Sequence, residues 1–212
     1  RSRLVVLQGI DTAGKDGVIR KVMTGLNPQG CVVTPFKKPA GEEVEHDYLW
    51  RVHKACPRRG EVGVFNRSHY EDVLVVRVHE LVHGKRLERR YETINGFERM
   101  LTDEGTHVVK FFLWISQDEQ KKRLQERLED PEKNWKFSEA DLKERALWKE
   151  YIDAFNIALG RCSTEHAPWW IVPANRKWFR DWMVARVLRT TLEGFKMEWP
   201  RTTLDLTKVK VK

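Results

Sequence analysis

The chain has 212 residues, of which 41% are hydrophobic and 33% charged, and this balance predicts one globular domain rather than a disordered or fibrous protein. Its net charge of +8 favours polyanionic partners, whether nucleic acid, nucleotides or another phosphate polymer. Three cysteines without a Cys-x-x-Cys pair, no secretory signal and no apolar run of membrane length argue against a disulfide framework, a zinc site and a membrane span, and favour the cytoplasm.

A strand, a glycine-rich loop and a helix are predicted at the start of the chain. Four consecutive apolar residues at 4–7 indicate a buried strand, and apolar residues over 18–26 recur at the spacing of one helix face. Between them, Gly9 to Lys15 fits Gly-x-x-x-x-Gly-Lys, which in this context predicts a phosphate-binding P-loop. Backbone N–H groups and the helix N-terminus would hold the anion and the lysine would reach its phosphates, whereas the alternative is an ordinary turn with a solvated lysine. The loop residues expected to bind phosphate are Gly9, Ala13, Gly14, Lys15, Asp16 and Gly17.

Two acidic residues of this loop are candidates for metal binding. The position after Lys15 usually holds a Ser or Thr whose hydroxyl binds Mg²⁺, but here it holds Asp16. A phosphate site without that hydroxyl still needs a metal, and carboxylate oxygens suit Mg²⁺, so Asp11 is the preferred ligand. Asp16 could instead cap the helix, and the sequence does not distinguish these two roles.

A second strand is predicted over residues 31–36, and it leads into a basic, turn-forming segment that begins with Lys37. A helix is predicted over 46–55 and carries Arg51.

The third predicted strand, over 61–65, ends in a polar segment. In α/β sheets, ligands bind at the carboxyl ends of parallel strands. Asn66 takes the place of the Asp that often helps to hold Mg²⁺ in P-loop proteins, and it offers an oxygen without a charge. Arg67 is expected to grip phosphate bidentately, and the alternative is a surface ion pair with Glu71 or Asp72.

A long helix is predicted over 73–101, with most of its arginines on a solvated face, and it is followed by a fourth strand over 106–116. Lys110 lies within this most hydrophobic stretch of the chain. We interpret it as marking a strand end, or as a side chain whose charged tip reaches solvent.

The charged segment 117–150 is predicted to form two short helices between the last two strands. Three polar residues of its first helix share one face, namely Gln120, Arg123 and Arg127. Ser138 is expected to cap the second helix after a bend at Asp130. Two helices joined by a basic turn are typical of a lid over a phosphate site.

The chain is predicted to end in a fifth strand over 167–173 and a helix over 177–195. Four residues recur on that helix at helical spacing, and we interpret them as core packing rather than as a platform for stacking bases: Trp178, Trp182, Ala185 and Leu192. The lysine-rich tail after Pro200 is expected to be loosely held. At the other end, the chain begins almost on its first strand, which leaves room for a missing upstream segment.

Four motifs in chain order resemble those of one family over essentially the whole chain: GIDTAGKDG, FNRSHYEDV, NWKFSEADL with Trp148 and Tyr151 downstream, and APWWIVPA. Together they look like a family-2 polyphosphate kinase. The resemblance implies an α/β fold of three layers, a P-loop kinase fold similar to thymidylate kinase. Five parallel strands would lie between helices in a single domain over 1–212, with a mobile helical lid at about 117–150.

The resemblance also implies an activity, Mg²⁺-dependent phosphoryl transfer between inorganic polyphosphate and a nucleotide, with Mn²⁺ able to replace Mg²⁺. Asn66 in place of a frequent Asp, and Glu71 where other branches have Asn, resemble the branch that phosphorylates both AMP and ADP. The expected partners are therefore polyphosphate and adenine or other purine nucleotides, without nucleic acid or membrane. The family resemblance suggests a cytoplasmic homo-oligomer, either a dimer or a tetramer.

Carried over by position, the resemblance assigns roles to individual residues. The catalytic residues would be Asp11, Lys15 and Arg67, and the metal ligands Asp11 and Glu71. The lid residues that contact polyphosphate would be Arg123, Arg127, Lys133 and Lys136. The nucleotide would be bound by Lys37, Arg51, Asn66, Arg67 and Glu71.

Two other functions fit the same motifs. One is an ATP-dependent nucleoside monophosphate kinase, because spacing and charge alone do not separate polyphosphate from ATP as the phosphoryl donor. The other is a non-catalytic module that binds polyanions and retains a dead P-loop. Against this second function, Asp11, Lys15 and Arg67 are all present, and phosphoryl transfer needs mainly such positioning and charge neutralisation.

Overall fold

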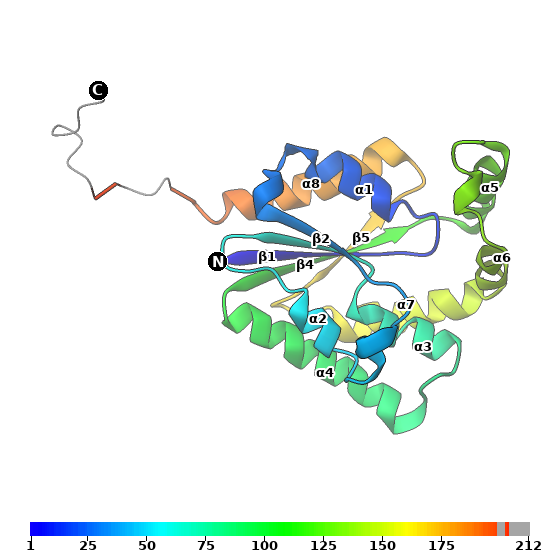
Figure 1. Ribbon diagram of the computed structural model, residues 1–212, viewed down its shortest axis with the longest axis horizontal. Helices are drawn as coiled ribbons and strands as arrows, with labels where there is room; N and C mark the ends of the chain where they lie inside the picture. Colours follow the sequence, from blue (N-terminus) through cyan, green and yellow to red (C-terminus); the bar gives the residue numbers. More distant parts are fainter. Residues whose placement is uncertain (199–201, 204–212) are drawn as a thin grey trace.

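A five-stranded parallel sheet between two layers of helices forms the protein in this computed structural model, which describes residues 1–198 and 202–203 (Figure 1). The strand order is β2-β3-β1-β4-β5. The strands are β1 (Ser2–Gln8), β2 (Cys31–Pro35), β3 (Val62–Asn66), β4 (Thr106–Trp114) and β5 (Trp169–Pro173). The predicted α/β fold and its five strands are confirmed. The side chain of Lys136 and nearly all of the tail after Pro200 lie outside the described residues.

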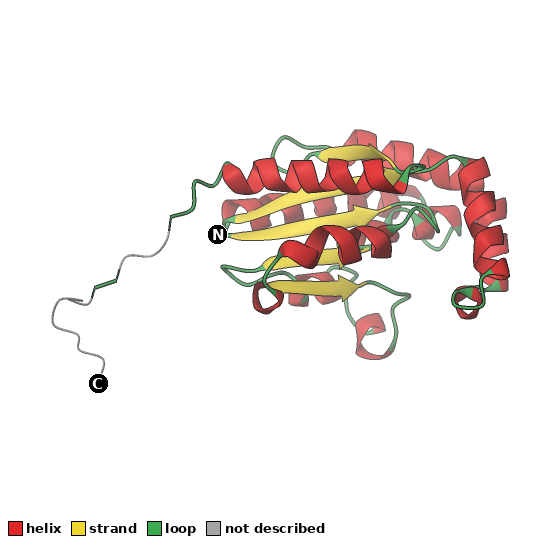
Figure 2. Ribbon diagram, turned by 90° about the horizontal axis from the view of Figure 1, so that it is seen from above, coloured by secondary structure: helices red, strands yellow, loops and turns green. Residues whose placement is uncertain are grey.

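Two helices cover one face of the sheet, α1 (Lys15–Val22) and α8 (Lys177–Glu193) (Figure 1). The other face is covered by α2 (Trp50–Lys54), α3 (Val75–Val78), α4 (Gly84–Asp103) and α7 (Trp148–Cys162). Two more helices, α5 (Gln117–Glu129) and α6 (Glu139–Ala146), stand beyond the carboxyl ends of the strands (Figure 2). No helix in the described part of the chain is long and apolar enough to cross a membrane.

The core follows from the position of β1 in the middle of the sheet. Every residue of β1 is buried, and successive side chains point to opposite faces. Leu4 and Val6 pack on the side of α4 and α7, whereas Val5 and Leu7 pack on the side of α1 and α8. A strand covered on both faces needs a continuous apolar run, which explains the pattern that predicted it.

Two predicted helices differ from the structure. The helix expected over 73–101 is divided into α3 and α4. Glu80, which lies between them, and Gly84, where α4 begins, have positive φ angles of 51° and 60°, which a continuing helix does not allow. The helix expected over 46–55 is shortened to α2 and is preceded by a 3-10 turn at Gly41–Val44. The side chain of Asp47 accepts a hydrogen bond from the N–H of Leu49, which favours a turn there.

The interpretation of Lys110 as a strand end or a side chain that reaches solvent is wrong. It lies in the middle of β4 and is fully buried, because α4 and α7 cover this face of the sheet. Its ammonium group is 2.5 Å from the carboxylate of Glu98 on α4. The charge therefore remains in the core because it has a buried partner.

The expected packing of the aromatic stripe on the last helix is also wrong. Trp178 is 66% exposed and Trp182 is 47% exposed. The face of α8 that is buried instead carries Arg180, Val184, Val187 and Leu188. The face of α8 that carries Arg180 points inward because this side chain contacts the P-loop at Gly14. The face that carries the two tryptophans therefore points outward.

Candidate active site

The P-loop between β1 and α1 depends on glycine at two positions. A Cβ atom on Gly9 would lie 2.7 Å from the carbonyl oxygen of Leu113, closer than real contacts allow. Gly14 has a φ of 98°, and a Cβ atom there would lie 1.9 Å from the guanidinium of Arg180. Gly14 also precedes α1 as its N-cap without a side-chain cap, so the helix capping considered for Asp16 is not found.

Lys15 folds back over this loop. Its ammonium group donates hydrogen bonds to the carbonyl oxygens of Gly9, at 2.8 Å, and Ile10, at 3.4 Å. Burial, together with the positive charge of Arg67, lowers the pKa of Lys15 from 10.5 to about 8. Two cations are thus held near each other, and an anion bound between them would relieve their repulsion.

The carboxyl end of β3 lies beside the start of α1. Asn66 donates a hydrogen bond from Nδ2 to Oδ1 of Asp16 at 2.6 Å, which joins the two elements. Arg67 lines the cavity and also lies 3.4 Å from Glu71. The alternative interpretation of Arg67, an ion pair with Glu71, is therefore confirmed, whereas Asp72 pairs with Arg90 instead. Phosphate binding by Arg67 stays a prediction.

Helix α5 lies against the P-loop through the face that the sequence predicted. Gln120 donates a hydrogen bond to the carbonyl oxygen of Asp11 at 3.3 Å, and Arg123 donates one to that of Thr12 at 2.9 Å. Arg127 forms ion pairs with the carboxylates of Asp11, at 3.4 Å, and Asp141, at 3.0 Å. The predicted alignment of Gln120, Arg123 and Arg127 is confirmed.

Arg123 is more constrained than a simple phosphate ligand. It is buried, and its guanidinium also donates hydrogen bonds to the carbonyl oxygens of Ala174 and Asn175 and to the carboxylate of Glu119. It therefore joins the P-loop to the segment between β5 and α8. Arg123 therefore also fixes the loop against α5.

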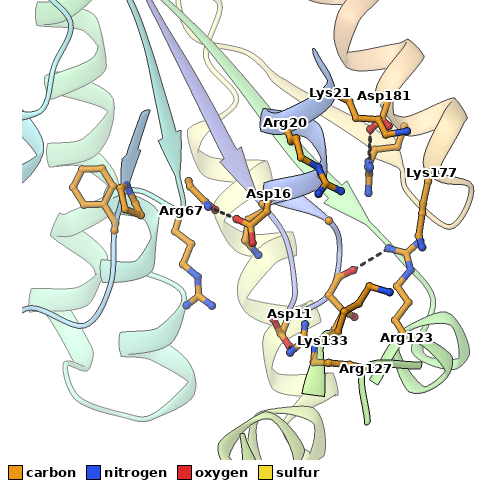
Figure 3. Close-up of a pocket in the computed structure, with 18 of the residues that line it drawn as sticks. Asp11, Asp16, Arg20, Lys21, Arg67, Arg123, Arg127, Lys133, Lys177 and Asp181 are labelled. Atoms are coloured by element: carbon orange, nitrogen blue, oxygen red, sulfur yellow. Dashed lines mark hydrogen bonds and ion pairs between the residues drawn. The ribbon is translucent and has the colours of Figure 1, made fainter. Parts of the chain in front are cut away.

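The loop opens into a strongly basic cavity of about 610 Å³ (Figure 3). Eleven cationic side chains line it: Lys15, Arg20, Lys21, Lys37, Lys38, Arg67, Arg123, Arg127, Lys133, Lys177 and Arg180. Only four carboxylates oppose them, those of Asp11, Asp16, Glu126 and Asp181. Such an excess of positive charge from several elements suits a polyanionic ligand with many phosphate oxygens.

Several predicted site residues do not line this cavity directly. Gly9 and Ala13 belong to the loop backbone beneath it, and Glu71 stands behind Arg67. Arg51 is buried and donates hydrogen bonds to the carbonyl oxygen of Lys37 and to Glu43, so it holds the strand-end segment. The side chain of Lys136 lies outside the described residues.

Sequence reasoning missed the basic wall contributed by α1 and α8. In Figure 3, Arg20 and Lys21 on α1 and Lys177 on α8 lie on the far side of the loop from Arg67. Arg180 on the same wall is buried and paired with Asp181 at 2.7 Å. The sequence did contain one signal for this wall: Arg180 shares a helix face with the apolar residues Val184 and Val187, which indicates a buried arginine.

Among the described residues, no metal site is made of protein side chains alone. The part of the chain that the structure describes holds no group of three or more His, Cys, Asp or Glu residues arranged for a metal ion. Asp11 and Asp16 nevertheless both line the cavity. Mg²⁺ is commonly held by one or two carboxylates together with substrate phosphates, and this donor set fits that pattern.

Comparison with known proteins gives concordant matches over nearly the whole chain. The model of the family Polyphosphate kinase 2 matches residues 1–200. A protein named AMP/ADP-polyphosphate phosphotransferase from Meiothermus ruber is 55% identical over 198 residues, which cover 93% of this chain and 74% of that protein. An ADP-polyphosphate phosphotransferase from Rhodopseudomonas palustris is 48% identical, with 94% and 73% covered. The crystal structure of Polyphosphate Kinase 2 from Arthrobacter aurescens has a TM-score of 0.95 at 50% identity, with 98% of this chain and 73% of that one covered.

Proposed function

Because the chain belongs to the polyphosphate kinase 2 family, we propose that it transfers phosphoryl groups reversibly between inorganic polyphosphate and the adenine nucleotides AMP and ADP. The observation that carries this proposal is the cavity above the P-loop, where eleven cations face four carboxylates. A chain of phosphates offers matching negative charge along its whole length. An ATP-dependent nucleoside monophosphate kinase is the competing function, and the names of the relatives favour polyphosphate as the donor.

We propose that Lys15 and Arg67 bind the transferred phosphoryl group from opposite sides. Lys15 begins α1 directly after the loop, Arg67 follows the end of β3, and burial together with the charge of Arg67 lowers the pKa of Lys15. Two fixed cations around one phosphate would stabilise the charge that develops on its oxygens during transfer. The loop amides of 13–17 and the cations Arg127, Lys133 and Lys136 would hold the neighbouring phosphates of the donor.

The acceptor nucleotide would bind on the side of β2 and β3. Lys37, Asn66 and Arg67 line the cavity there, and Arg51 supports the segment that carries Lys37. In-line transfer places donor and acceptor on opposite sides of the moving phosphoryl group, which agrees with a donor held by the P-loop, α5 and α8.

We propose Mg²⁺ as the cofactor, with Mn²⁺ able to replace it. Asp11 is the proposed ligand in the loop, and Glu71 a second ligand that would act directly or through water. When bound, the ion would neutralise phosphate charge and align the reacting oxygens. Asp11 lines the cavity, and Glu71 contacts Arg67, which also lines it, so both carboxylates lie at the site where the phosphates would bind.

We further propose that residues 117–150 act as a lid of a single domain over 1–212. The segment contacts the P-loop through Arg123 and Arg127. Arg127 also reaches Asp141 on α6, so one side chain links both lid helices to the loop. Closing this segment would shield the reacting phosphates from water.

A homo-oligomer, dimeric or tetrameric, is proposed from an exposed aromatic surface. Trp178 and Trp182 on α8 and Trp170 on β5 are exposed, and β5 is an edge strand of the sheet. Exposed apolar patches at a sheet edge commonly mark protein interfaces.

The three free cysteines support a reducing compartment such as the cytoplasm.

The test of the proposed function is to incubate the protein with Mg²⁺, polyphosphate and ADP in the absence of ATP. Formation of ATP is expected, and AMP as the acceptor should yield ADP. Failure to form either product with a folded protein would refute polyphosphate as the donor. A second incubation with ATP and AMP alone identifies the competing monophosphate kinase.

A further inference from the structure

Four polar side chains lie in the core behind the active site, and the proposed chemistry uses none of them. His69 and Tyr70 come from the 3-10 turn at His69–Asp72, Glu98 from α4 and Lys110 from β4. All four are completely buried. Buried charged groups are uncommon unless they are paired, so this cluster requires an explanation.

The cluster is tightly connected. The ammonium group of Lys110 lies 2.5 Å from Oε2 of Glu98 and donates a hydrogen bond to the hydroxyl of Tyr70 at 2.7 Å. That hydroxyl donates to Oε1 of Glu98 at 3.0 Å, and Nε2 of His69 lies 3.2 Å from the same oxygen. Lys110 also donates to the carbonyl oxygen of Cys162, the last residue of α7, at 2.7 Å.

Within the cluster, the carboxylate of Glu98 and the ammonium group of Lys110 each stabilise the charged form of the other. Burial alone would raise the pKa of Glu98, but the hydrogen bond from His69 and the charge of Lys110 outweigh it and lower that pKa. Burial lowers the pKa of Lys110, and the carboxylate of Glu98 acts in the opposite direction. A buried ion pair of this kind often adds no net stability over well-packed apolar residues, so stability alone does not explain it.

The cluster is continuous with the segment that carries Arg67. Arg67 has a φ of 63°, an uncommon conformation for a residue with a side chain. Its N–H donates to the carbonyl oxygen of Leu7 at 3.0 Å, and the hydroxyl of the next residue, Ser68, accepts a hydrogen bond from Gln8 at 3.1 Å. His69 and Tyr70 follow immediately, so the cluster fixes the chain on the far side of Arg67.

We propose that Lys110, Glu98, Tyr70 and His69 are positioning residues that hold the segment 67–71 so that Arg67 faces the P-loop. This inference rests on the proposed function, because it assigns the cluster to the geometry of phosphoryl transfer. The physical reason is that Glu98 on α4 contacts both His69 and Tyr70, and that Lys110 on β4 contacts Tyr70 and the end of α7. Small displacements of a catalytic cation have large effects on rate, so a rigid support is required.

The test uses two variants that remove different parts of the cluster. Tyr70→Phe removes only the bridging hydroxyl, and Lys110→Met with Glu98→Leu replaces the ion pair by apolar side chains of similar size. We expect kcat with polyphosphate to fall about 10- to 100-fold in each, with a much smaller change in KM for ADP. The same substitutions in an Arg67→Ala background should change kcat less than about two-fold, because the residue that they position is gone.

Arg3→Met is the matched control. Arg3 is also a buried cation, and it donates hydrogen bonds to the carbonyl oxygens of Leu188 and Thr191 near the other end of β1. Its replacement should lower stability while leaving kcat unchanged, both in the parent and in the Arg67→Ala background. The proposal would be overturned if folded Tyr70→Phe had the same kcat as the parent protein. It would also be overturned if Tyr70→Phe reduced kcat by the same factor in the Arg67→Ala background as in the parent.

Binding of tripolyphosphate, measured by calorimetry, separates this inference from the proposed function. If the parent protein transferred no phosphoryl groups, the proposed function would fail. The positioning role of the cluster could still be tested through the affinity for tripolyphosphate. Tyr70→Phe should then weaken tripolyphosphate binding in the parent and leave it unchanged in Arg67→Ala. Equal weakening in both backgrounds would refute the positioning role.

Discussion

Replacing Lys15 by methionine should separate the catalytic value of this side chain from its effect on stability. Lys15→Met keeps the length of the buried side chain and removes its charge. Loss of one preorganised charge donor typically costs about 3 kcal/mol of transition-state stabilisation, or roughly 10²–10³ in rate. We therefore expect kcat/KM for polyphosphate and ADP to fall by that factor.

Stability should respond in the opposite direction. The pKa of Lys15 is lowered from 10.5 to about 8 in the folded protein, which corresponds to roughly 3 kcal/mol of unfavourable interaction with the charged form. Two hydrogen bonds to the carbonyl oxygens of Gly9 and Ile10 offset it by about 1 kcal/mol each. Lys15→Met should accordingly leave the free energy of unfolding at pH 7 unchanged or raise it slightly.

The pH dependence follows from the same shift. Between about pH 8 and 10.5 the unfolded chain retains the Lys15 proton while the folded protein has lost it, so this residue makes stability rise with pH in that window. Denaturant unfolding at pH 7 and pH 9.5 should show this rise in the parent and not in Lys15→Met. For the same reason, kcat/KM of the parent should decline above about pH 8, as Lys15 loses its charge.

Steady-state kinetics and denaturant unfolding on the same preparations provide the assay. Lys121→Met is the control, because Lys121 is an exposed lysine of α5 that does not line the cavity. It should leave both quantities unchanged. Full activity in folded Lys15→Met would show that the P-loop is not the active site, and a large loss of stability would show that Lys15 serves the fold.

Three further substitutions address the metal, the donor and the acceptor. Asp11→Asn should reduce the rate at least as much as Lys15→Met, and titration with Mg²⁺ should restore part of it; a defect independent of Mg²⁺ would exclude a metal-binding role. Arg127→Ala should raise KM for polyphosphate several-fold in low salt, and added salt should narrow the difference from the parent because it screens charges over about 8–10 Å. If the affinity of the parent protein for polyphosphate did not change with salt concentration, this electrostatic role of Arg127 would be contradicted. Glu71→Asn should reduce phosphorylation of AMP much more than that of ADP, because AMP has fewer oxygens with which to hold a bridging metal. Equal losses with both acceptors would mean that Glu71 serves only as the partner of Arg67.

The sequence by itself determined the features that depend on local pattern. The apolar run at 4–7, the glycine-rich loop and the helical spacing after it predicted β1, the P-loop and α1 correctly. The shared face of Gln120, Arg123 and Arg127 also follows from helix geometry alone, because residues three or four positions apart lie on one side. These predictions hold because each one concerns residues that are neighbours along the chain.

Only the tertiary structure decided which polar and aromatic side chains are buried. Lys110 is stabilised in the core by Glu98 from α4, and Arg180 turns α8 toward the P-loop, so that Trp178 and Trp182 are left exposed. The pattern within β4 or α8 does not contain this information. Burial of a charge depends on a partner from a distant segment, and that partner is set only when the helices pack on the sheet.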